Sequence, residues 1–179
     1  WKNYEILVVE NNSENKETFA YYEALKGRYD NVRILTWKKE FNYSSINNFA
    51  VKEARGEYLL FLNNDVEIIT PSWMEEMLQI CQQDGVGITG AKLYYSDDTI
   101  QHAGVVLGLG GIAGHIMCKA RREDIGYMGR MVCVQEISAV TAACMLVKTS
   151  VFKAAGGFDE ELRVAFNDID LCMQVRQMG

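Results

Sequence analysis

The fold class is decided by the stretch Gly56-Glu57-Tyr58-Leu59-Leu60-Phe61-Leu62-Asn63-Asn64-Asp65. Its apolar run, Tyr58 to Leu62, is short and is followed at once by three polar residues, a pattern that predicts a buried strand. Because the run is apolar on both faces, we expect helices on both sides of its sheet. Ligands bind beyond the carboxyl ends of strands in open α/β sheets, so Asp65 is predicted to stand at a ligand site. Taken alone, the polar triplet is more typical of a plain turn.

Two β-α units precede this strand. The first combines a strand over 4–10, ending in Glu10-Asn11-Asn12-Ser13, with a helix over 14–29. The second combines a strand over 32–36 with a helix over 42–54. Such alternation is typical of parallel strands joined by right-handed crossovers. The sequence therefore predicts an α/β fold with a mixed, mostly parallel sheet and helices on both faces.

The chain after Asp65 is predicted to alternate between helices and shorter strands. Thr70 and Pro71 are predicted to open a helix, with Thr70 as its N-cap. Strands are expected over 86–94 and 100–107, joined as a hairpin, and over 132–140 and 142–148, followed by a helix over 149–155. The four glycines in 108–114 have the wrong spacing for a dinucleotide-binding loop, so we expect a flexible connection there.

Composition limits the class of protein. The 179 residues are 49% hydrophobic and 23% charged, which suits one globular α/β domain. The net charge of -6 argues against a nucleic-acid partner. No apolar run reaches the ~20 residues that span a bilayer, and no signal peptide is visible. Five cysteines without a C-x-x-C pair are expected to be buried thiols in a reducing compartment.

The last predicted helix carries a second acidic residue of interest. Asn167 or Asp168 is expected to cap this helix, which runs to Met178. Asp168 precedes Leu171 and Cys172 by three and four residues, so it projects over the same inward face. A carboxylate in this position is either a helix cap or a functional group of the site, and the pattern leaves both roles open.

Three stretches, taken together, resemble the inverting glycosyltransferases of family 2, which have the GT-A fold. The stretches are Ile6-Leu-Val-Val-Glu10-Asn-Asn-Ser13, Ala54 to Asp65, and Gly156-Gly-Phe-Asp-Glu160 with the following Asn167-Asp168-Ile-Asp170-Leu-Cys-Met-Gln-Val-Arg176. Each is weak alone, but their order and spacing match the family. The runs 41–48 and 101–107 also resemble the subgroup that builds rhamnose-containing and other surface polysaccharides.

The resemblance implies roles around a nucleotide-sugar donor. Asp65 matches the second Asp of the metal-binding motif, where Mg²⁺ or Mn²⁺ would neutralise the leaving diphosphate. Asn63 stands where the family usually has the first Asp, and an amide oxygen binds a cation without contributing charge. Glu10 matches the acid that meets the nucleoside base. Asn12 and Asn64 are expected beside the same donor.

The resemblance also implies an acceptor side. Asp168 matches the catalytic base that takes a proton from the acceptor hydroxyl. Asn167 replaces the family's usual Glu, and Asp170 is expected either to orient the site or to stabilise the helix N-terminus. Neither His102 nor His115 has a partner at ligand or catalytic spacing in the sequence. We expect His102 to be structural, and we keep His115 as a candidate for the acceptor side.

The predicted function is transfer of a sugar, with inversion, from a nucleotide-diphosphate sugar to a glycan or lipid-linked acceptor. We expect a cytoplasmic location, peripheral to the inner face of the membrane in the full-length protein. Two alternatives stay open: a sugar-phosphate nucleotidyltransferase and a non-catalytic nucleotide-sugar-binding module. The family's first strand is expected before Trp1, and its late His after Gly179. We therefore expect residues 1–179 to be one domain truncated at both ends. The exposed sheet edge beside 4–10 would then favour dimers.

Overall fold

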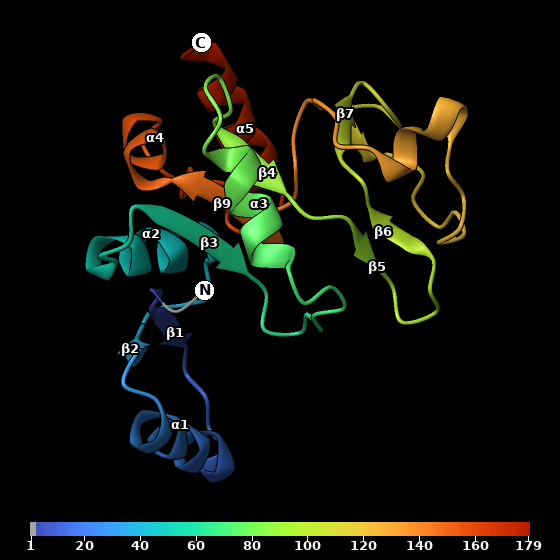
Figure 1. The fold of residues 1–179 in the computed structure, drawn as a ribbon. Helices are drawn as coiled ribbons and strands as arrows, with labels where there is room; N and C mark the ends of the chain where they lie inside the picture. Colours follow the sequence, from blue (N-terminus) through green and yellow to red (C-terminus); the bar gives the residue numbers. More distant parts are fainter. Residues whose placement is uncertain (1–2) are drawn as a thin grey trace.

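A three-stranded sheet forms the centre of the molecule in a computed structural model that describes residues 3–179 (Figure 1). Its strands are β3 (Tyr58–Leu62), β9 (Cys144–Lys148) and β4 (Ile88–Gly90), with β9 in the middle. Both neighbours run antiparallel to β9, so β3 and β4 point in the same direction. The helix between them, α3 (Trp73–Cys81), makes the crossover that the β-α alternation predicted.

Helices cover both faces of this sheet, as predicted. Alternate residues of β9 face opposite ways: Met145 and Val147 join one apolar cluster, and Cys144 and Leu146 join the other. The first cluster contains residues of α2 (Tyr43–Glu53), α4 (Thr149–Ala154) and α5 (Asn167–Gln177). The second contains Met77 and Cys81 of α3. Leu59 and Phe61 of β3 belong to the first cluster, and Tyr58 and Leu60 pack against the second, so both faces of this strand meet helices. Leu62, at the end of the strand, is 43% exposed.

The first β-α unit stands apart from this core. Strands β1 (Ile6–Glu10) and β2 (Val32–Thr36) pair in parallel, and α1 (Lys16–Arg28) connects them. In Figure 1 this unit extends from the sheet, below β3. Asn15 caps α1 by accepting a hydrogen bond from the backbone N–H of Glu17, yet no residue of α1 is buried. Helix α1 therefore does not contribute to the core of the described residues.

Two antiparallel hairpins and an irregular segment lie between β4 and β9. Strands β5 (Leu93–Tyr94) and β6 (Ile100–His102) form the first hairpin, as predicted. Strands β7 (Val105–Leu107) and β8 (Ala113–His115) form the second, so the glycine-rich stretch is a hairpin turn. The segment that follows contains a short 3₁₀ element, η1 (Tyr127–Val132).

Several sequence predictions need correction. The mostly parallel sheet is not confirmed, because β9 lies between β3 and β4 and, within residues 3–179, only the β1–β2 pair is parallel. The strand predicted over 132–140 is wrong: Val132 and Val134 are exposed, and the segment makes one isolated bridge, from Ala139 to Val105. Ser72, rather than Thr70, precedes the first residue of α3.

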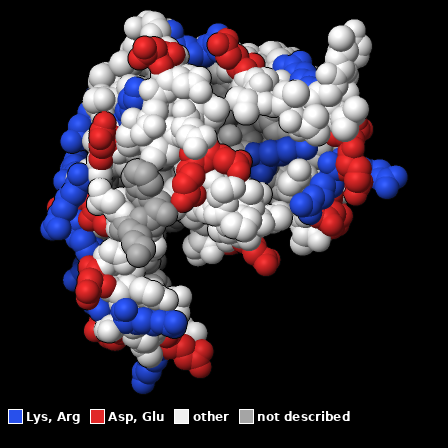
Figure 2. Space-filling view, in the orientation of Figure 1, with Lys and Arg blue, Asp and Glu red and all other residues white. Residues whose placement is uncertain are grey.

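The cysteines follow the prediction only in part. Cys81, Cys144 and Cys172 are free and buried, but Cys118 and Cys133 are free and exposed. Acidic and basic side chains are mixed over the face of the molecule shown in Figure 2. Within residues 3–179, no helix combines the length and the apolar character needed to cross a bilayer.

Candidate active site

The segment Thr141-Ala142-Ala143, just before β9, joins the elements that carry the predicted site residues. The carbonyl oxygen of Ala143 accepts a hydrogen bond of 3.0 Å from the backbone N–H of Asn63, at the carboxyl end of β3. The N–H of Ala142 donates to Oδ2 of Asp168 at 3.2 Å. Through these two neighbouring residues, the Asn-Asn-Asp turn and the start of α5 are held against the same stretch of backbone.

Asp168 is a half-buried carboxylate with capacity left for a further proton or hydrogen bond. Its Oδ1 accepts from the N–H of Ile169 at 2.9 Å, while Oδ2 accepts from Ala142. An ionised carboxylate offers about four acceptor positions, so two backbone donors leave it unsaturated. Asp168 also lines a cavity of about 330 Å³ between α5 and the β7–β8 hairpin. The side chain is therefore held firmly and still faces open space.

The backbone at the start of α5 is unusual. Phe166 precedes the helix with φ at 65°, in the left-handed region that a bulky residue rarely adopts. Asn167 and Asp168 lie inside the first turn, so neither is the cap that the sequence predicted. Asn167 is buried and donates from Nδ2 to the carbonyl of Leu162 at 3.2 Å. These contacts fix the direction in which the side chain of Asp168 projects from the helix.

Tyr43 packs against the same site from α2. Its hydroxyl donates to the carbonyl of Ala142 at 3.2 Å. Burial, and next the nearby charge of Asp168, raise the pKa of Tyr43 to about 12. Tyr43 is thus a neutral hydrogen-bond donor at any physiological pH, and it buttresses the backbone that holds Asp168. No role for Tyr43 was predicted, because its contact with Ala142 joins residues far apart in the chain.

Polar residues of α2 also hold the loop that leads to α5. Ser45 Oγ and Asn48 Nδ2 donate to the two carboxylate oxygens of Glu160, at 2.8 and 3.2 Å. These hydrogen bonds, Ser45's first, hold the pKa of Glu160 below its usual range. Asn48 additionally exchanges hydrogen bonds with both the N–H and the carbonyl of Phe158. The Gly-Gly-Phe-Asp-Glu stretch and the 41–48 run are therefore joined by several hydrogen bonds.

The two histidines form a pair, which corrects the expectation that neither has a partner. Their Nδ1 atoms lie 2.9 Å apart, and the rings meet edge to face with centroids 5.0 Å apart. His102 is 1% exposed, whereas His115 is exposed and lines the same cavity as Asp168. Burial, followed by the charge of His115, lowers the pKa of His102 to about 4. The predicted structural role of His102 agrees with its burial.

The Asn-Asn-Asp turn presents its side chains to solvent. Asn64 and Asp65 are exposed and Asn63 is half-buried. Within residues 3–179, no cluster of three or more acidic, histidine or cysteine side chains could enclose a metal ion. Asp65 with the Asn63 amide instead suits a hard cation held by one carboxylate and by substrate phosphates, the usual mode for Mg²⁺. The residues present therefore fit a cation that arrives with a phosphorylated ligand.

The end of β1 is enclosed by the loop that follows it. Glu10 is 6% exposed, and its Oε1 accepts from the N–H of Ser13 at 2.6 Å. Asn12 has φ at 56°, and its Nδ2 donates to the carbonyl of Lys39 at 2.9 Å. Both side chains thus shape the loop after β1. In the described part of the chain, no hydrogen bond or ion pair links Glu10 or Asp65 directly to Asp168.

Asp170 lies apart from the cavity. Its Oδ2 accepts from Nε2 of Gln174, one turn along α5, at 2.6 Å. The cavity is lined instead by Val105, Ala113, His115, Ala165, Phe166, Asp168 and Ile169. Among the three residues predicted for the acceptor side, the structure brings His115 and Asp168 together and leaves Asp170 outside.

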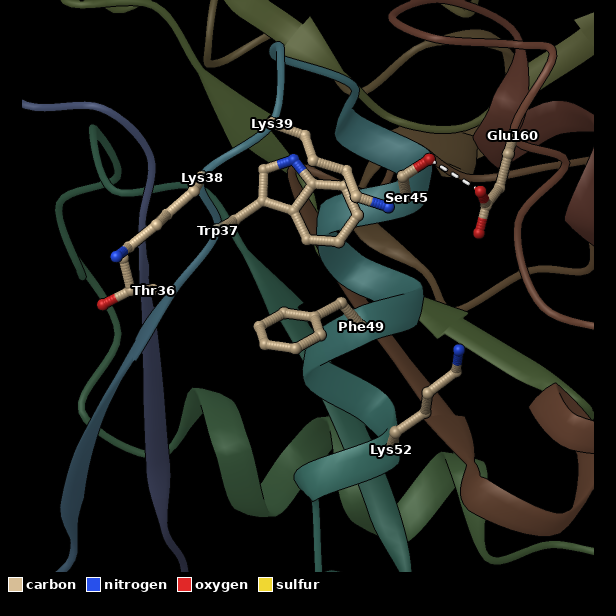
Figure 3. Close-up of a pocket in the computed structure, with 8 residues that line it drawn as sticks. All are labelled: Thr36, Trp37, Lys38, Lys39, Ser45, Phe49, Lys52 and Glu160. Carbon is tan, nitrogen blue, oxygen red and sulfur yellow. Dashed lines mark hydrogen bonds between the residues drawn. The ribbon is translucent and has the colours of Figure 1, made fainter.

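A second hollow, of about 500 Å³, lies between the segment after β2 and helix α2 (Figure 3). Figure 3 shows the rings of Trp37 and Phe49 beside each other and the hydrogen bond from Ser45 to Glu160 across the groove. Lys39 lies over the Trp37 ring, with Nζ 5.0 Å from its centroid. None of the residues predicted as site residues lines this groove.

Comparison with known proteins identifies the family. The sequence profile described as "Glycosyl transferase family 2" matches residues 1–155. The chain belongs to this family. The match includes the ends of β1 and β3, and it stops before α5, so the placement of Asp168 depends on the resemblance of its own stretch and on the structure.

Two longer bacterial proteins are similar along the whole chain. The "Uncharacterized protein y4gI" of Sinorhizobium fredii (strain NBRC 101917 / NGR234) is 49% identical over 178 residues, which are 99% of this chain and 20% of that protein. The "O-antigen biosynthesis protein RfbC" of Myxococcus xanthus is 40% identical over 182 residues, which are 100% of this chain and 14% of that protein. The chain thus spans a fifth or less of the length of these relatives.

Proposed function

We propose that this family 2 glycosyltransferase domain moves a sugar from a nucleoside-diphosphate sugar to an acceptor hydroxyl with inversion at the anomeric carbon. The observation that carries the proposal is the position of Asp168, which is held by Ala142 and lines a cavity beside the backbone that also binds the end of β3. The family membership supports glycosyl transfer over the nucleotidyltransferase alternative. The name of the Myxococcus relative, an O-antigen biosynthesis protein, supports a role in polysaccharide synthesis, for which we propose a glycan or lipid-linked acceptor.

The proposed reaction assigns one bond change to each side of the site. Asp168 accepts the proton of the attacking hydroxyl as the acceptor oxygen bonds to the anomeric carbon. The bond from that carbon to the diphosphate breaks, and the diphosphate leaves with the electron pair. Attack from the face opposite the leaving group inverts the configuration.

On the donor side, Asp65 and the Asn63 amide would hold Mg²⁺ or Mn²⁺ together with the diphosphate. When bound, such a cation neutralises the charge that develops on the leaving group. Glu10 and Asn12 lie at the end of β1, on the loop that would face the nucleoside, and Asn64 lies beside Asp65. Because Asn63 carries no charge, the protein's electrostatic contribution to cation binding rests on Asp65.

The test is nucleotide binding by the Asp65→Ala variant of the full-length protein. Calorimetric titration with nucleoside diphosphates should show tighter binding in Mn²⁺ than in EDTA for the wild type. The variant should lose most of that difference and keep its metal-free affinity. Glu67→Ala, which removes an exposed carboxylate two residues after Asp65 and outside the assigned donor site, should preserve the metal effect. An equal response to Mn²⁺ in wild type and Asp65→Ala would refute the donor-side assignment.

A further inference from the structure

The histidine pair offers a hydrogen-bond donor in the cavity that Asp168 lines. Nε2 of His102 accepts a hydrogen bond from the backbone N–H of Thr141 at 3.4 Å. A nitrogen that accepts carries no proton, so the neutral His102 ring has its proton on Nδ1. That N–H then points at His115 Nδ1, 2.9 Å away, and donates to it.

The tautomer of His115 follows from this order. Because its Nδ1 accepts from His102, a neutral His115 has its proton on Nε2. Within residues 3–179, no hydrogen bond uses Nε2 of His115, whose side chain is exposed and lines the cavity. The donor is therefore available to a ligand.

We propose that His115 is a positioning residue that donates from Nε2–H to an oxygen of the acceptor saccharide, in a tautomer set by buried His102. This proposal rests on the proposed function and deepens it, since it identifies which wall of the cavity orients the acceptor. It separates two roles: Asp168 receives the proton, and His115 holds the sugar. His115 is not the base, because its Nδ1 is occupied and its Nε2 already carries hydrogen.

The cavity has the character of a saccharide subsite. Aliphatic side chains from the hairpin and from α5, Val105, Ala113 and Ile169, give it apolar walls, and Asp168 and His115 supply an acceptor and a donor. The β7–β8 register places His115 opposite Val105, which is 2% exposed, so the hairpin that carries His115 is anchored in the core. A sugar presents apolar C–H faces and hydroxyls that both donate and accept, and this combination matches the walls.

The tautomer is tested by NMR of the histidine ring nitrogens in the ¹⁵N-labelled 179-residue chain. We expect His115 to carry its proton on Nε2 and His102 to carry its proton on Nδ1 at neutral pH. The reverse pattern would overturn the proposal, because His115 would then present a bare Nε2 to the cavity.

Ligand binding is tested by saturation-transfer NMR with a panel of methyl glycosides and the full-length protein. We expect at least one glycoside to bind to the wild type and to His115→Gln, which keeps an N–H donor near the position of Nε2. His115→Phe keeps a ring but has no donor, and it should raise the Kd about 2- to 13-fold, the value of one neutral hydrogen bond. An unchanged Kd in His115→Phe, or no glycoside bound by the wild type, would overturn the proposal.

A parallel titration with nucleoside diphosphate and Mn²⁺ separates this inference from the proposed function. Donor-side affinity should be the same in wild type and His115→Phe; its loss in the variant would place His115 on the donor side and overturn the proposal. If the wild type bound no nucleotide while the glycoside response still depended on His115, glycosyl transfer would fail and the saccharide subsite would stand.

Discussion

Asp168 is the residue on which the proposed chemistry depends most directly. Asp168→Asn keeps the size of the side chain and one carbonyl oxygen, but removes the group that can accept a proton. A general base contributes about 10²–10⁴-fold in rate, so turnover by the full-length protein should fall by that order. Donor affinity should hold, because Asp65 and the end of β3 are unchanged. Steady-state rates together with nucleotide titrations measure the two effects separately.

Asp170→Asn is the matched control for this prediction. Asp170 is on the same first turn of α5, but its carboxylate is engaged by Gln174 and does not line the cavity. Turnover should therefore stay within a few-fold of the wild type. Full activity in Asp168→Asn combined with loss of activity in Asp170→Asn would transfer the role of base to Asp170.

His102 links the site to the pH dependence of stability. Its pKa falls from 6.5 to about 4 on folding, chiefly through burial, so the folded protein resists protonating it. The unfolded chain binds that proton first as pH falls. The contribution of neutral His102 to the free energy of unfolding is therefore fully present above pH ~6.5 and is lost as the pH falls toward ~4. It amounts to about 3 kcal/mol. Urea unfolding between about pH 7 and 4.5 measures this loss.

His102→Asn isolates this contribution from the titration of carboxylates. Asn retains a donor for His115 but has no titrating ring, so its unfolding free energy should vary less with pH, whatever its value at pH 7. Parallel pH curves for wild type and variant would show that His102 does not titrate differently on folding.

Residue types could be predicted from the sequence better than their partners. Asp65 and Asp168 were singled out because each follows or begins a recognisable element. The histidine pair was missed because it depends on the fold of two hairpins that bring residues 102 and 115 together. The backbone donors of Thr141 and Ala142 were missed for a different reason: any residue except proline supplies the same N–H, so no sequence signal marks them.

At the scale of elements, the close approach of β4 to the Thr141–Ala143 segment is a sensitive point. A Cβ built on Gly90 would lie 2.5 Å from Cβ of Val140, the residue before that segment. Gly90→Ala should therefore displace Val140 and lower the unfolding free energy by about 1–3 kcal/mol, as overpacked sites do. Thermal or urea denaturation measures the loss, and turnover should fall with it if Ala142 moves away from Asp168.

Gly27→Ala provides the comparison for this steric prediction. A Cβ at Gly27, in the last turns of α1, would meet no atom within 4 Å. Alanine also favours a helix over glycine by about 1 kcal/mol, so this variant should be neutral or slightly more stable. Equal stability of Gly90→Ala and the wild type would mean that β4 and Val140 can separate without cost.

Helices and strands that a local sequence pattern determines were predicted well. The pairing of strands, which depends on distant residues, was predicted poorly. The strands β1, β2 and β3 and the helix α2 lie within one or two residues of their expected ranges. The sheet was expected to be mostly parallel because the first half of the chain alternates strand and helix. Strand β9 makes the sheet antiparallel instead. It follows β3 by some 80 residues, so its pairing with β3 and β4 depends on contacts between distant parts of the chain. The apolar run over 132–140 has the right composition for a strand, but in the described residues it pairs only through the isolated bridge of Ala139 with Val105.

At the scale of the whole molecule, stability is distributed unevenly. The buried apolar residues run from Val51 to Cys172, so the core comprises the three-stranded sheet with the helices on its two faces. Among the described residues, no apolar side chain of β1, α1 or β2 is fully buried, and the contacts that join this unit to the core include the ion pair of Arg33 with Glu53 and the hydrogen bond from the Arg55 N–H to Glu5. Exposed contacts of this kind contribute little, about 0–1 kcal/mol for a surface ion pair. The loop that carries Glu10 and Asn12 therefore belongs to the less stable part.

Hydrogen exchange of the 179-residue chain should reveal this division. Helices α1 and α5 have similar lengths, 13 and 11 residues, but α1 buries no residue and α5 buries Asn167, Leu171 and Cys172. Amides of α1 should therefore exchange through local opening, at least 10-fold faster than those of α5 and β9, which need a larger unfolding event. Nucleoside diphosphate with Mn²⁺ should slow exchange in the β1–α1 loop if Glu10 and Asn12 contact the donor. Equal protection of α1 and β9 in the free chain would show that the β1–α1–β2 unit unfolds together with the core.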